Sequence, residues 1–282
     1  MSFEARLAAV LADDFRGVVP ADLAASIAEA TGCTVGELLP LLVPFAQRYA
    51  LPPISSFPVG AVAQGASGSL YLGANMEFVG TALGFTVHAE QSATTNAWLN
   101  GEEGLLAIAV SAAPCGYCRQ FLNELTTAAT LRVVIAGRDG RLLTELLPEP
   151  FGPDDLDVTA ALMSPQDHGL TLDPAPADPL VLAALAAANA SYAPYSQGFA
   201  GVALETASGA VYSGRYAENA AFNPSMSPLQ SALTMRVLGG ADDALTRAVL
   251  VEAPSAASQA AATAVLLEVV APAIDLEAFQ TA

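Results

Sequence analysis

The chain has 282 residues, which is long enough for two domains and a smaller appendage. Ten arginines, no lysine and 28 acidic residues give it a formal net charge of −18. Such acidity repels polyphosphates and anionic membrane surfaces, so it argues against a nucleic-acid or membrane partner and favours a small neutral substrate, although acidity also serves solubility alone. Three cysteines give no disulfide framework, no apolar run reaches the roughly 18 residues of a membrane span, and the start lacks a basic-then-apolar leader. These features predict a cytoplasmic protein.

Residues 1–48 are predicted to form a helical amino-terminal segment. Pro20 and Thr34 supply helix start signals. Three apolar faces follow helical spacing: Leu7, Val10 and Leu11; Leu23 and Ile27; Leu38, Leu39, Leu42 and Val43. Cys33 falls within this segment and is interpreted as a small core residue.

Residues 49–147 are predicted to form an α/β domain in the order ββαβαβ. Strands over 59–63 and 69–72 flank a Gly-Ala-Ser-Gly turn, and a helix begins at His88 and stops at Gly101. An apolar strand over 105–110, a helix from Cys115 and a strand over 132–136 follow. The helices therefore begin at strand-to-helix junctions, where open α/β sheets place ligands.

Residues 148–179 are rich in Pro and Asp and are predicted to be a linker. His168 lies in it and is expected to be an exposed loop residue rather than a metal ligand.

After the linker, in residues 180–282, the pattern of the first domain starts again. Strands over 201–206 and 210–213 precede Gly214-x-x-x-Glu218, which matches Gly73-x-x-x-Glu77 at an offset of 141 residues. The same offset places Ser231 where Glu90 stands, and this second copy contains no cysteine. It is predicted to have kept the fold and lost the metal, which leaves one zinc per chain.

The strongest functional signal is His88-Ala89-Glu90 followed by Pro114-Cys115-Gly116-Tyr117-Cys118. It offers three zinc ligands and a carboxylate that is not needed as a ligand, and a catalytic zinc keeps its fourth position open. His88 and Glu90 can reach one pocket only from the first turn of a helix, and two helix N-termini would favour thiolates at Cys115 and Cys118. The alternatives are a closed structural zinc with Cys33 as the fourth ligand and a dithiol redox pair. The order His-x-Glu, then Pro-Cys-x-x-Cys, is the signature of zinc-dependent nucleobase deaminases.

The sequence as a whole resembles the cytidine deaminases, in particular the long, homodimeric bacterial form with two core domains, over about residues 50–255. The runs that carry the resemblance are Phe57-Pro58-Val59-Gly60-Ala61, Gly73-Ala74-Asn75-Met76-Glu77-Phe78, His88-Ala89-Glu90-Gln91-Ser92-Ala93, Pro114-Cys115-Gly116-Tyr117-Cys118-Arg119-Gln120-Phe121 and Tyr216-Ala217-Glu218-Asn219-Ala220-Ala221-Phe222-Asn223-Pro224. The resemblance implies αβα layers with a duplicated core, of which one copy is catalytic and one lacks zinc.

The resemblance also implies roles for residues that the composition alone leaves undecided. Asn75 and Glu77 match positions that hydrogen-bond the ribose, and Phe57 matches the aromatic residue that packs on the nucleoside. Phe222, with Ala221 beside it, would reach into the active site of the other subunit of a homodimer. From the residues alone, Asn75 can be interpreted as a turn residue, Glu77 as a solvated carboxylate and Phe57 as a core residue.

The expected reaction is the hydrolysis of cytidine and deoxycytidine to uridine and deoxyuridine plus ammonia, as in pyrimidine salvage. Zinc on His88, Cys115 and Cys118 lowers the pKa of its water to about 7, hydroxide adds to C4 of the base, and Glu90 shuttles the protons. Backbone groups at Ala89 and at 111–114 are candidates for holding the base edge.

Three alternative functions share parts of this pattern. A deaminase of deoxycytidylate, a free base or RNA would have the same zinc motif, but no Lys or Arg lies between residues 49 and 118 to contact a phosphate. A zinc-binding module would need a fourth ligand, and a zinc-independent hydrolase would need a nucleophile with a free His base. Arg119 fits either a partner for a metal thiolate or a plain surface residue.

Overall fold

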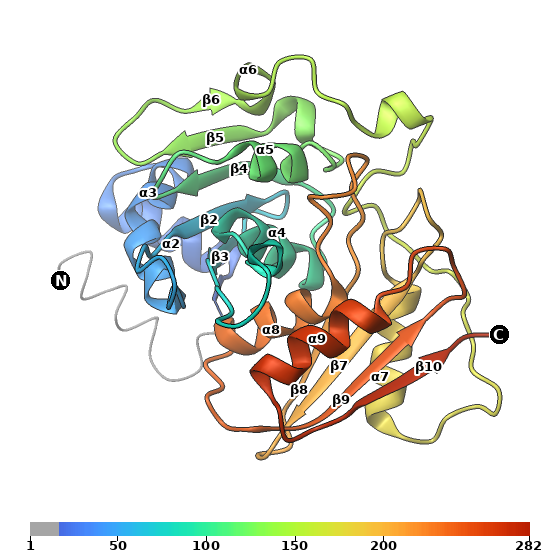
Figure 1. The fold of residues 1–282 in the computed structure, drawn as a ribbon. Helices are drawn as coiled ribbons and strands as arrows, with labels where there is room; N and C mark the ends of the chain where they lie inside the picture. Colours follow the sequence, from blue (N-terminus) through green and yellow to red (C-terminus); the bar gives the residue numbers. More distant parts are fainter. Residues whose placement is uncertain (1–16) are drawn as a thin grey trace.

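The computed structural model describes residues 17–282, so the predicted helix around Leu7, Val10 and Leu11 lies outside the described residues. The chain forms two sheets, with the first half above and the second half below in Figure 1. The predicted α/β fold with a duplicated core is confirmed.

The first half contains the helical segment and the first ββαβαβ unit. Its elements are β1 (Val18–Val19), α2 (Ala21–Thr31), α3 (Val35–Ala46), η1 (Gln47–Tyr49), β2 (Gly60–Gly65), β3 (Leu70–Ala74), η2 (Leu83–Phe85), α4 (Ala89–Leu99), β4 (Leu105–Val110), α5 (Gly116–Leu122), η3 (Ala128–Thr130), β5 (Arg132–Ile135), β6 (Arg141–Leu142) and α6 (Leu143–Leu146). The strands form one sheet in the order β1-β3-β2-β4-β5-β6, in which only β4 and β5 are parallel.

The amino-terminal helices cover one face of this sheet. Pro20 is the N-cap of α2, and Thr34 forms a capping box with Glu37 at the start of α3, as the start signals predicted. Leu39 and Leu42 of α3 pack with Val62 of β2 in one buried cluster.

In residues 17–282 no single helix is long and apolar enough to cross a membrane. Helix α2 together with Val35–Tyr49 passes the length and composition test only as a pair bent by 99°.

Alternate residues of β2 face opposite sides of the sheet. Ala61 and Ala63 pack toward α4, on the other side from Val62. This alternation gives α4 and α3 separate apolar surfaces, which produces the αβα layers.

The predicted linker packs against both cores. It contains η4 (Pro153–Leu156), and Leu162 is buried and pairs with Leu125 through an isolated bridge. His168 is half-buried rather than exposed: its ring stacks on Phe199 with centroids 3.5 Å apart, and its Nε2 lies 2.8 Å from the Ser191 carbonyl oxygen. The segment that its Pro and Asp content marks as a linker is therefore held in place by contacts at several points.

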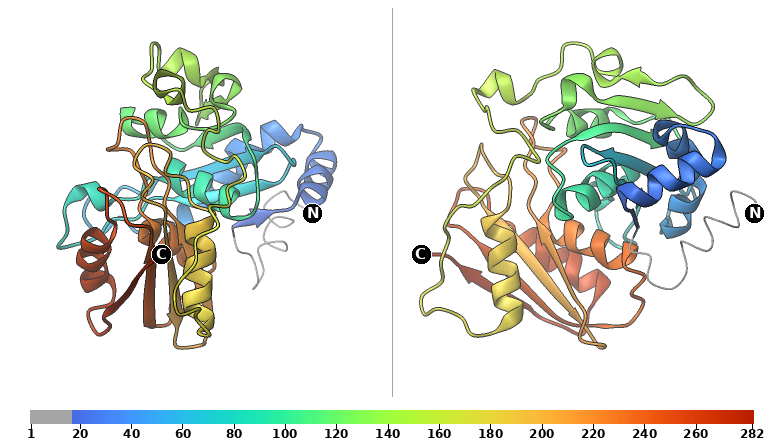
Figure 2. Two further views of the ribbon diagram at one scale, coloured as in Figure 1. Left: turned by 90° about the vertical axis from the view of Figure 1, so that its right-hand side faces the viewer. Right: turned by 180° about the vertical axis from the view of Figure 1, so that it is seen from behind.

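The second half repeats the ββαβαβ order. Its elements are α7 (Pro179–Asn189), β7 (Ala200–Thr206), β8 (Val211–Arg215), α8 (Pro228–Leu238), β9 (Leu245–Glu252), α9 (Ala260–Val270) and β10 (Leu276–Gln280). The sheet order β8-β7-β9-β10 matches β3-β2-β4-β5, and β9 and β10 are parallel as β4 and β5 are. Figure 2 shows α7 and α9 on opposite faces of this sheet.

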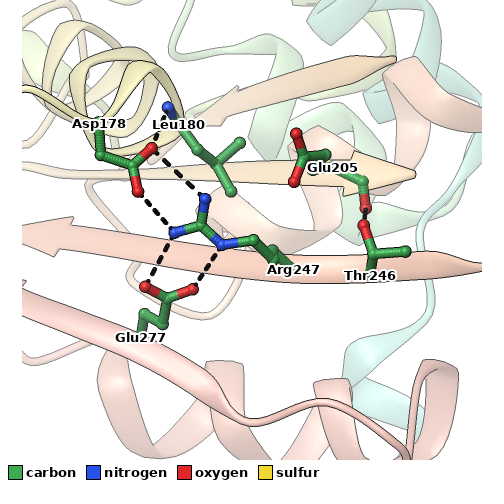
Figure 3. Close-up of polar contacts among 6 residues, drawn as sticks. All are labelled: Asp178, Leu180, Glu205, Thr246, Arg247 and Glu277. Atoms are coloured by element: carbon green, nitrogen blue, oxygen red, sulfur yellow. Dashed lines mark hydrogen bonds and ion pairs between the residues drawn. The ribbon is translucent and has the colours of Figure 1, made fainter. Parts of the chain in front are cut away.

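One charged cluster holds α7, β9 and β10 together (Figure 3). Arg247 of β9 contacts Asp178 at 2.7 Å and Glu277 of β10 at 2.9 Å. Asp178 also accepts a hydrogen bond from the Leu180 amide, so it caps α7 and pairs with the sheet at once.

The offset of 141 residues between the copies does not persist into the helices. Ser92 accepts a hydrogen bond from the Ala74 amide at 3.2 Å, and Ser231 accepts the same bond from Arg215 at 3.2 Å. Ser231 therefore corresponds to Ser92, because the loop before α8 is two residues shorter than the loop before α4. The prediction that Ser231 stands at the place of Glu90 is wrong; Leu229 stands there.

The two cores meet along α4 and α8. Gln91 donates to the Pro224 carbonyl oxygen at 3.3 Å, and Gln230, its counterpart in α8, donates to the Phe85 carbonyl oxygen at 2.9 Å. Each helix start thus binds the loop of the other core, and one buried apolar cluster runs through both. The arrangement positions the start of α4, which carries the predicted metal motif.

Candidate active site

The predicted metal motif lies at the starts of two neighbouring helices. His88 is the N-cap of α4, and Cys115 is the N-cap of α5. Glu90 is in the first turn of α4, as the two-residue spacing required. The close approach of α4 to β3 depends on Gly73, where a Cβ would lie 2.1 Å from the Ala93 backbone nitrogen.

Donor atoms of His88, Cys115 and Cys118 gather within 4.8 Å of one another. The Cys115 Sγ lies 3.7 Å from His88 Nδ1 and 3.5 Å from Cys118 Sγ. Tetrahedral zinc with bonds of about 2.3 Å to sulfur and about 2.0 Å to nitrogen requires donor separations of roughly 3.5 to 3.8 Å. Two of the three donor separations therefore match those around a tetrahedral zinc ion, and three protein ligands leave the fourth position for water or substrate.

The electrostatics of the cluster favour a cation. Hydrogen bonds from Cys118 and His88 lower the pKa of the Cys115 thiol to about 3. The pKa of Cys118 is raised, because its thiol proton is held in the hydrogen bond to Cys115, because burial disfavours its thiolate, and because a second thiolate would be repelled by the first. A cation between the sulfur atoms removes that repulsion and stabilises both as thiolates.

Glu90 is a buried carboxyl group beside the cluster. Only 4% of its surface is exposed, and burial raises its pKa above the ordinary value. A raised carboxyl pKa suits a group that must both accept and release protons near neutral pH.

A cavity of about 430 Å³ opens in front of these groups. It is lined by the predicted residues Phe57, Asn75, Glu77, His88, Ala89, Glu90 and Cys115, and by Ser55, Val59, Thr86, Ala112 and Ala113. The residues predicted from the sequence thus line one pocket, except for Cys118, which is buried, and Phe222.

Asn75 and Glu77 hold the rim of this pocket through hydrogen bonds. The Asn75 side chain accepts from the Val59 amide at 2.8 Å and donates to the Phe57 carbonyl oxygen at 3.0 Å. Glu77 accepts from the amides of Ile54 and Ser55 at 2.8 and 2.9 Å, and hydrogen bonds with Ser55 lower its pKa. Both side chains order the rim segment that carries Phe57, whose ring is 59% exposed.

Phe222 does not line the pocket of its own chain. It is 64% exposed and has a φ of 59°, an uncommon backbone conformation for a large side chain. Its loop is anchored to the first core, where Asn219 donates to the Gln120 carbonyl oxygen at 3.0 Å and the Ala220 amide donates to Glu124 at 2.9 Å. The ring is held out at the surface of the described chain.

Sequence reasoning missed Glu124. This fully buried carboxyl group follows the α5 helix and accepts hydrogen bonds from the Tyr192 and Tyr195 hydroxyls as well as from Ala220. Burial raises its pKa. The signal in the sequence was only an acidic residue in an apolar stripe, and its partners are about 70 to 100 residues away, so local pattern could not reveal the cluster.

The geometry also bears on two alternatives from the sequence, Cys33 as a fourth zinc ligand and Arg119 as a thiolate partner. Cys33 lies outside the donor cluster and contacts Thr31 at 3.0 Å, so the described residues offer no closed four-ligand site through it. Arg119 is neither a thiolate partner nor a plain surface residue: it donates to the carbonyl oxygens of Pro114 and Leu146, at 2.9 and 2.7 Å, and so braces the loop that leads to Cys115.

Comparison with known proteins adds independent findings. Two family profiles described as "Cytidine and deoxycytidylate deaminase zinc-binding region" match residues 37–135 and 143–265. A cytidine deaminase of Aeromonas hydrophila subsp. hydrophila is 54% identical over 251 residues, which is 88% of this chain and 85% of that protein. A cytidine deaminase of Yersinia pestis (strain Pestoides F) is 51% identical over 246 residues, 87% of this chain and 83% of its own. The solved cytidine deaminase of Mycobacterium tuberculosis is 33% identical, covers 42% of this chain and 97% of its own, and has a TM-score of 0.38.

Proposed function

The chain belongs to the cytidine deaminase family and is a zinc-dependent hydrolytic deaminase of cytidine, and from this premise we propose the roles of its residues. The observation that carries the assignment is the donor cluster at zinc-like separations with a buried, non-ligating carboxyl group beside it. The net reaction is cytidine plus water to uridine plus ammonia, and we extend it to deoxycytidine and to a place in pyrimidine salvage.

His88, Cys115 and Cys118 would hold one zinc ion per chain. When bound there, zinc would lower the pKa of a water ligand to about 7 and so supply hydroxide near neutral pH. The second core lacks the donor set, because Ser227 is the N-cap of α8 where His88 is the N-cap of α4, and no cysteine follows it.

Glu90 is assigned as the proton carrier. It takes a proton from the attacking water and delivers it to N3 of the base. It then takes the proton of the new C4 hydroxyl group and passes it to the exocyclic amine, which leaves as ammonia while C4 becomes a carbonyl. Glu90 lines the pocket together with His88 and Cys115. Its burial there raises its pKa.

The rest of the pocket fits a nucleoside. Asn75 and Glu77 present oxygen and nitrogen atoms at the rim for ribose hydroxyls, the Phe57 ring offers a packing surface, and the backbone at Ala89, Ala112 and Ala113 lines the part nearest the base. No Lys or Arg side chain lines the pocket, and His88 is a zinc ligand, so a 5′-phosphate would find no charged partner there. This argues for nucleosides over nucleotides and nucleic acid.

We further propose a homodimer in which Phe222 enters the partner's pocket. Five large apolar side chains near the pocket rim are strongly exposed: Leu51, Ile54, Phe57, Val79 and Leu83. Large apolar side chains left exposed in one stretch of chain, 51–83, are the kind of surface that a protein interface covers. Burying it against a second copy would also enclose the pocket, and the rigidly anchored, exposed Phe222 ring is a suitable closing group.

The domain boundaries that we propose are a helical segment over 1–48, the catalytic core over 49–147, a linker over 148–179 and the second core over 180–282. A reducing, cytoplasmic location would suit free thiols at Cys33, Cys115 and Cys118.

The test is ammonia release from cytidine, deoxycytidine, cytosine, deoxycytidylate and a cytidine-containing oligonucleotide, measured with the zinc-loaded protein. Nucleosides should be turned over much faster than the other three, because free cytosine makes no ribose contacts at the rim and the phosphates meet an acidic chain. Turnover of the oligonucleotide or of deoxycytidylate at a rate comparable to cytidine would overturn the assignment of a nucleoside substrate.

A further inference from the structure

A second cavity lies beside β8 and shares no lining residue with the substrate pocket. Its volume is about 390 Å³. The walls come from the carboxyl end of α4, from α7, from β8 and from α8. It is therefore built where the two cores meet, at the opposite end of α4 from His88.

The duplication explains why this space exists. In the first core β1 covers the outer edge of β3: Val18 pairs with Tyr71, and the Leu72 amide donates to the Gly17 carbonyl oxygen at 2.7 Å. In the second core β8 is the edge strand, and no strand of the described chain covers it. Tyr212 and Ser213, the counterparts of Tyr71 and Leu72, line the cavity instead. The cavity thus occupies the place that β1 fills in the first core.

Arg215 gives the cavity its chemical character. Its guanidinium lies over the Trp98 ring, 5.3 Å from the centroid, and this is its one side-chain interaction among residues 17–282. No carboxylate of the described chain pairs with it, whereas Arg247 pairs with two. Burial lowers the pKa of Arg215. A half-buried cation that has no anionic partner lowers the free energy of unfolding. Arg215 lacks such a partner although the chain contains 28 acidic residues.

The other groups around Arg215 complete a site for a small anion. Asn100, Tyr212 and Ser213 line the same cavity as Arg215, and their side chains carry an amide and two hydroxyl groups. Leu99 and Met235 bring apolar surface. Guanidinium groups bind carboxylate and phosphate oxygens through paired hydrogen bonds, and ligand pockets combine a few such polar groups with apolar walls.

We propose that this cavity binds a small organic oxyanion, a carboxylate or a phosphate monoester with a compact apolar body, with Arg215 as its charged anchor. The site is separate from deamination, so its test does not depend on turnover.

Trp98 makes the proposal testable, because it is the only tryptophan in the chain and lies against Arg215. The zinc-loaded protein is titrated with sodium hexanoate and, separately, with sodium phosphate, and sodium chloride serves as the ionic-strength control. We expect a saturable change in Trp98 emission and a concentration-dependent rise in Tm with hexanoate, with phosphate or with both, and neither with chloride. A response to hexanoate alone assigns a carboxylate ligand, and a response to phosphate alone assigns a phosphate ligand.

Arg215→Gln should weaken the binding by at least about tenfold, because it removes the charge-assisted hydrogen bonds. Arg141→Gln is the matched control: Arg141 is exposed, pairs with Glu145 and lies outside the cavity, so binding should be unchanged. Arg215→Met guards against misfolding, since an apolar replacement of an unpaired cation should keep Tm at or above that of the wild type. The proposal is overturned if neither probe gives a saturable change at millimolar concentrations, or if both Arg215 variants, folded, bind as tightly as the wild type.

Discussion

Replacing Glu90 by Gln separates proton transfer from metal binding. The side chain is 4% exposed, and Gln has nearly the same volume, so packing at the start of α4 should be preserved. Because Glu90 is not one of the three clustered donors, zinc content should remain close to one per chain. The change removes only the group that accepts and releases protons.

The expected loss is large. General acid–base catalysis is worth about 10² to 10⁴ in rate, or about 2.7 to 5.4 kcal/mol at about 1.36 kcal/mol per decade, and Glu90 serves more than one proton transfer. We therefore expect kcat for ammonia release from cytidine to fall by a factor of at least about 10². KM should change much less. The assay pairs steady-state ammonia release with metal analysis of the same sample.

The zinc-free protein supplies a second readout with a defined sign. Burial raises the folded-state pKa of Glu90, so ionisation opposes folding as the pH rises from the ordinary carboxyl value through the folded pKa. Gln cannot ionise. Glu90→Gln should therefore unfold, after chelation of zinc, at a temperature equal to or above that of the wild type at alkaline pH. Near-normal turnover by Glu90→Gln, or loss of zinc in parallel with activity, would refute the reasoning.

Four other predictions concern a metal ligand, the two close helix–strand contacts and Phe222. Cys115→Ala should lose zinc as well as activity, whereas Cys33→Ser should retain both; equal zinc loss in the two variants, by metal analysis, would favour a closed structural site. Gly73→Ala should destabilise the fold by at least about 1–3 kcal/mol and displace the start of α4, since the new Cβ would lie 2.1 Å from a backbone atom. In the second core, a Cβ at Gly214 would lie 2.2 Å from the Ala232 backbone nitrogen. Gly214→Ala should therefore lower the free energy of unfolding, measured with denaturant, by a similar amount, while the protein that remains folded keeps its zinc. Phe222→Ala should keep zinc and lose turnover, and coexpression with a variant that lacks the proton carrier should restore part of the activity through mixed dimers; no recovery, or a fully active monomer by light scattering, would contradict the shared site.

The sequence by itself determined the elements and the metal motif, because both are local. Alternating and helical apolar spacing predicted the elements of the first ββαβαβ unit and the first two strands of the second within two residues, and Thr34 and Pro20 marked helix starts that the structure confirms. The spacing of His88 and Glu90 required a helix start, since only there can side chains two residues apart face one pocket. A reaction class could be read from those few residues because zinc chemistry restricts its ligands so tightly.

Only the tertiary structure decided what depends on distant contacts. A constant offset placed Ser231 opposite Glu90, but the hydrogen bonds of Ser92 and Ser231 show that a shorter loop shifts the register by two residues. Glu124 and Arg215 carried no local signal: one is a buried acceptor for groups from the second core, and the other is a cation whose surroundings come from both cores. Burial and partnership are properties of the packed chain, because segments far apart in sequence supply the atoms that desolvate or pair a charge.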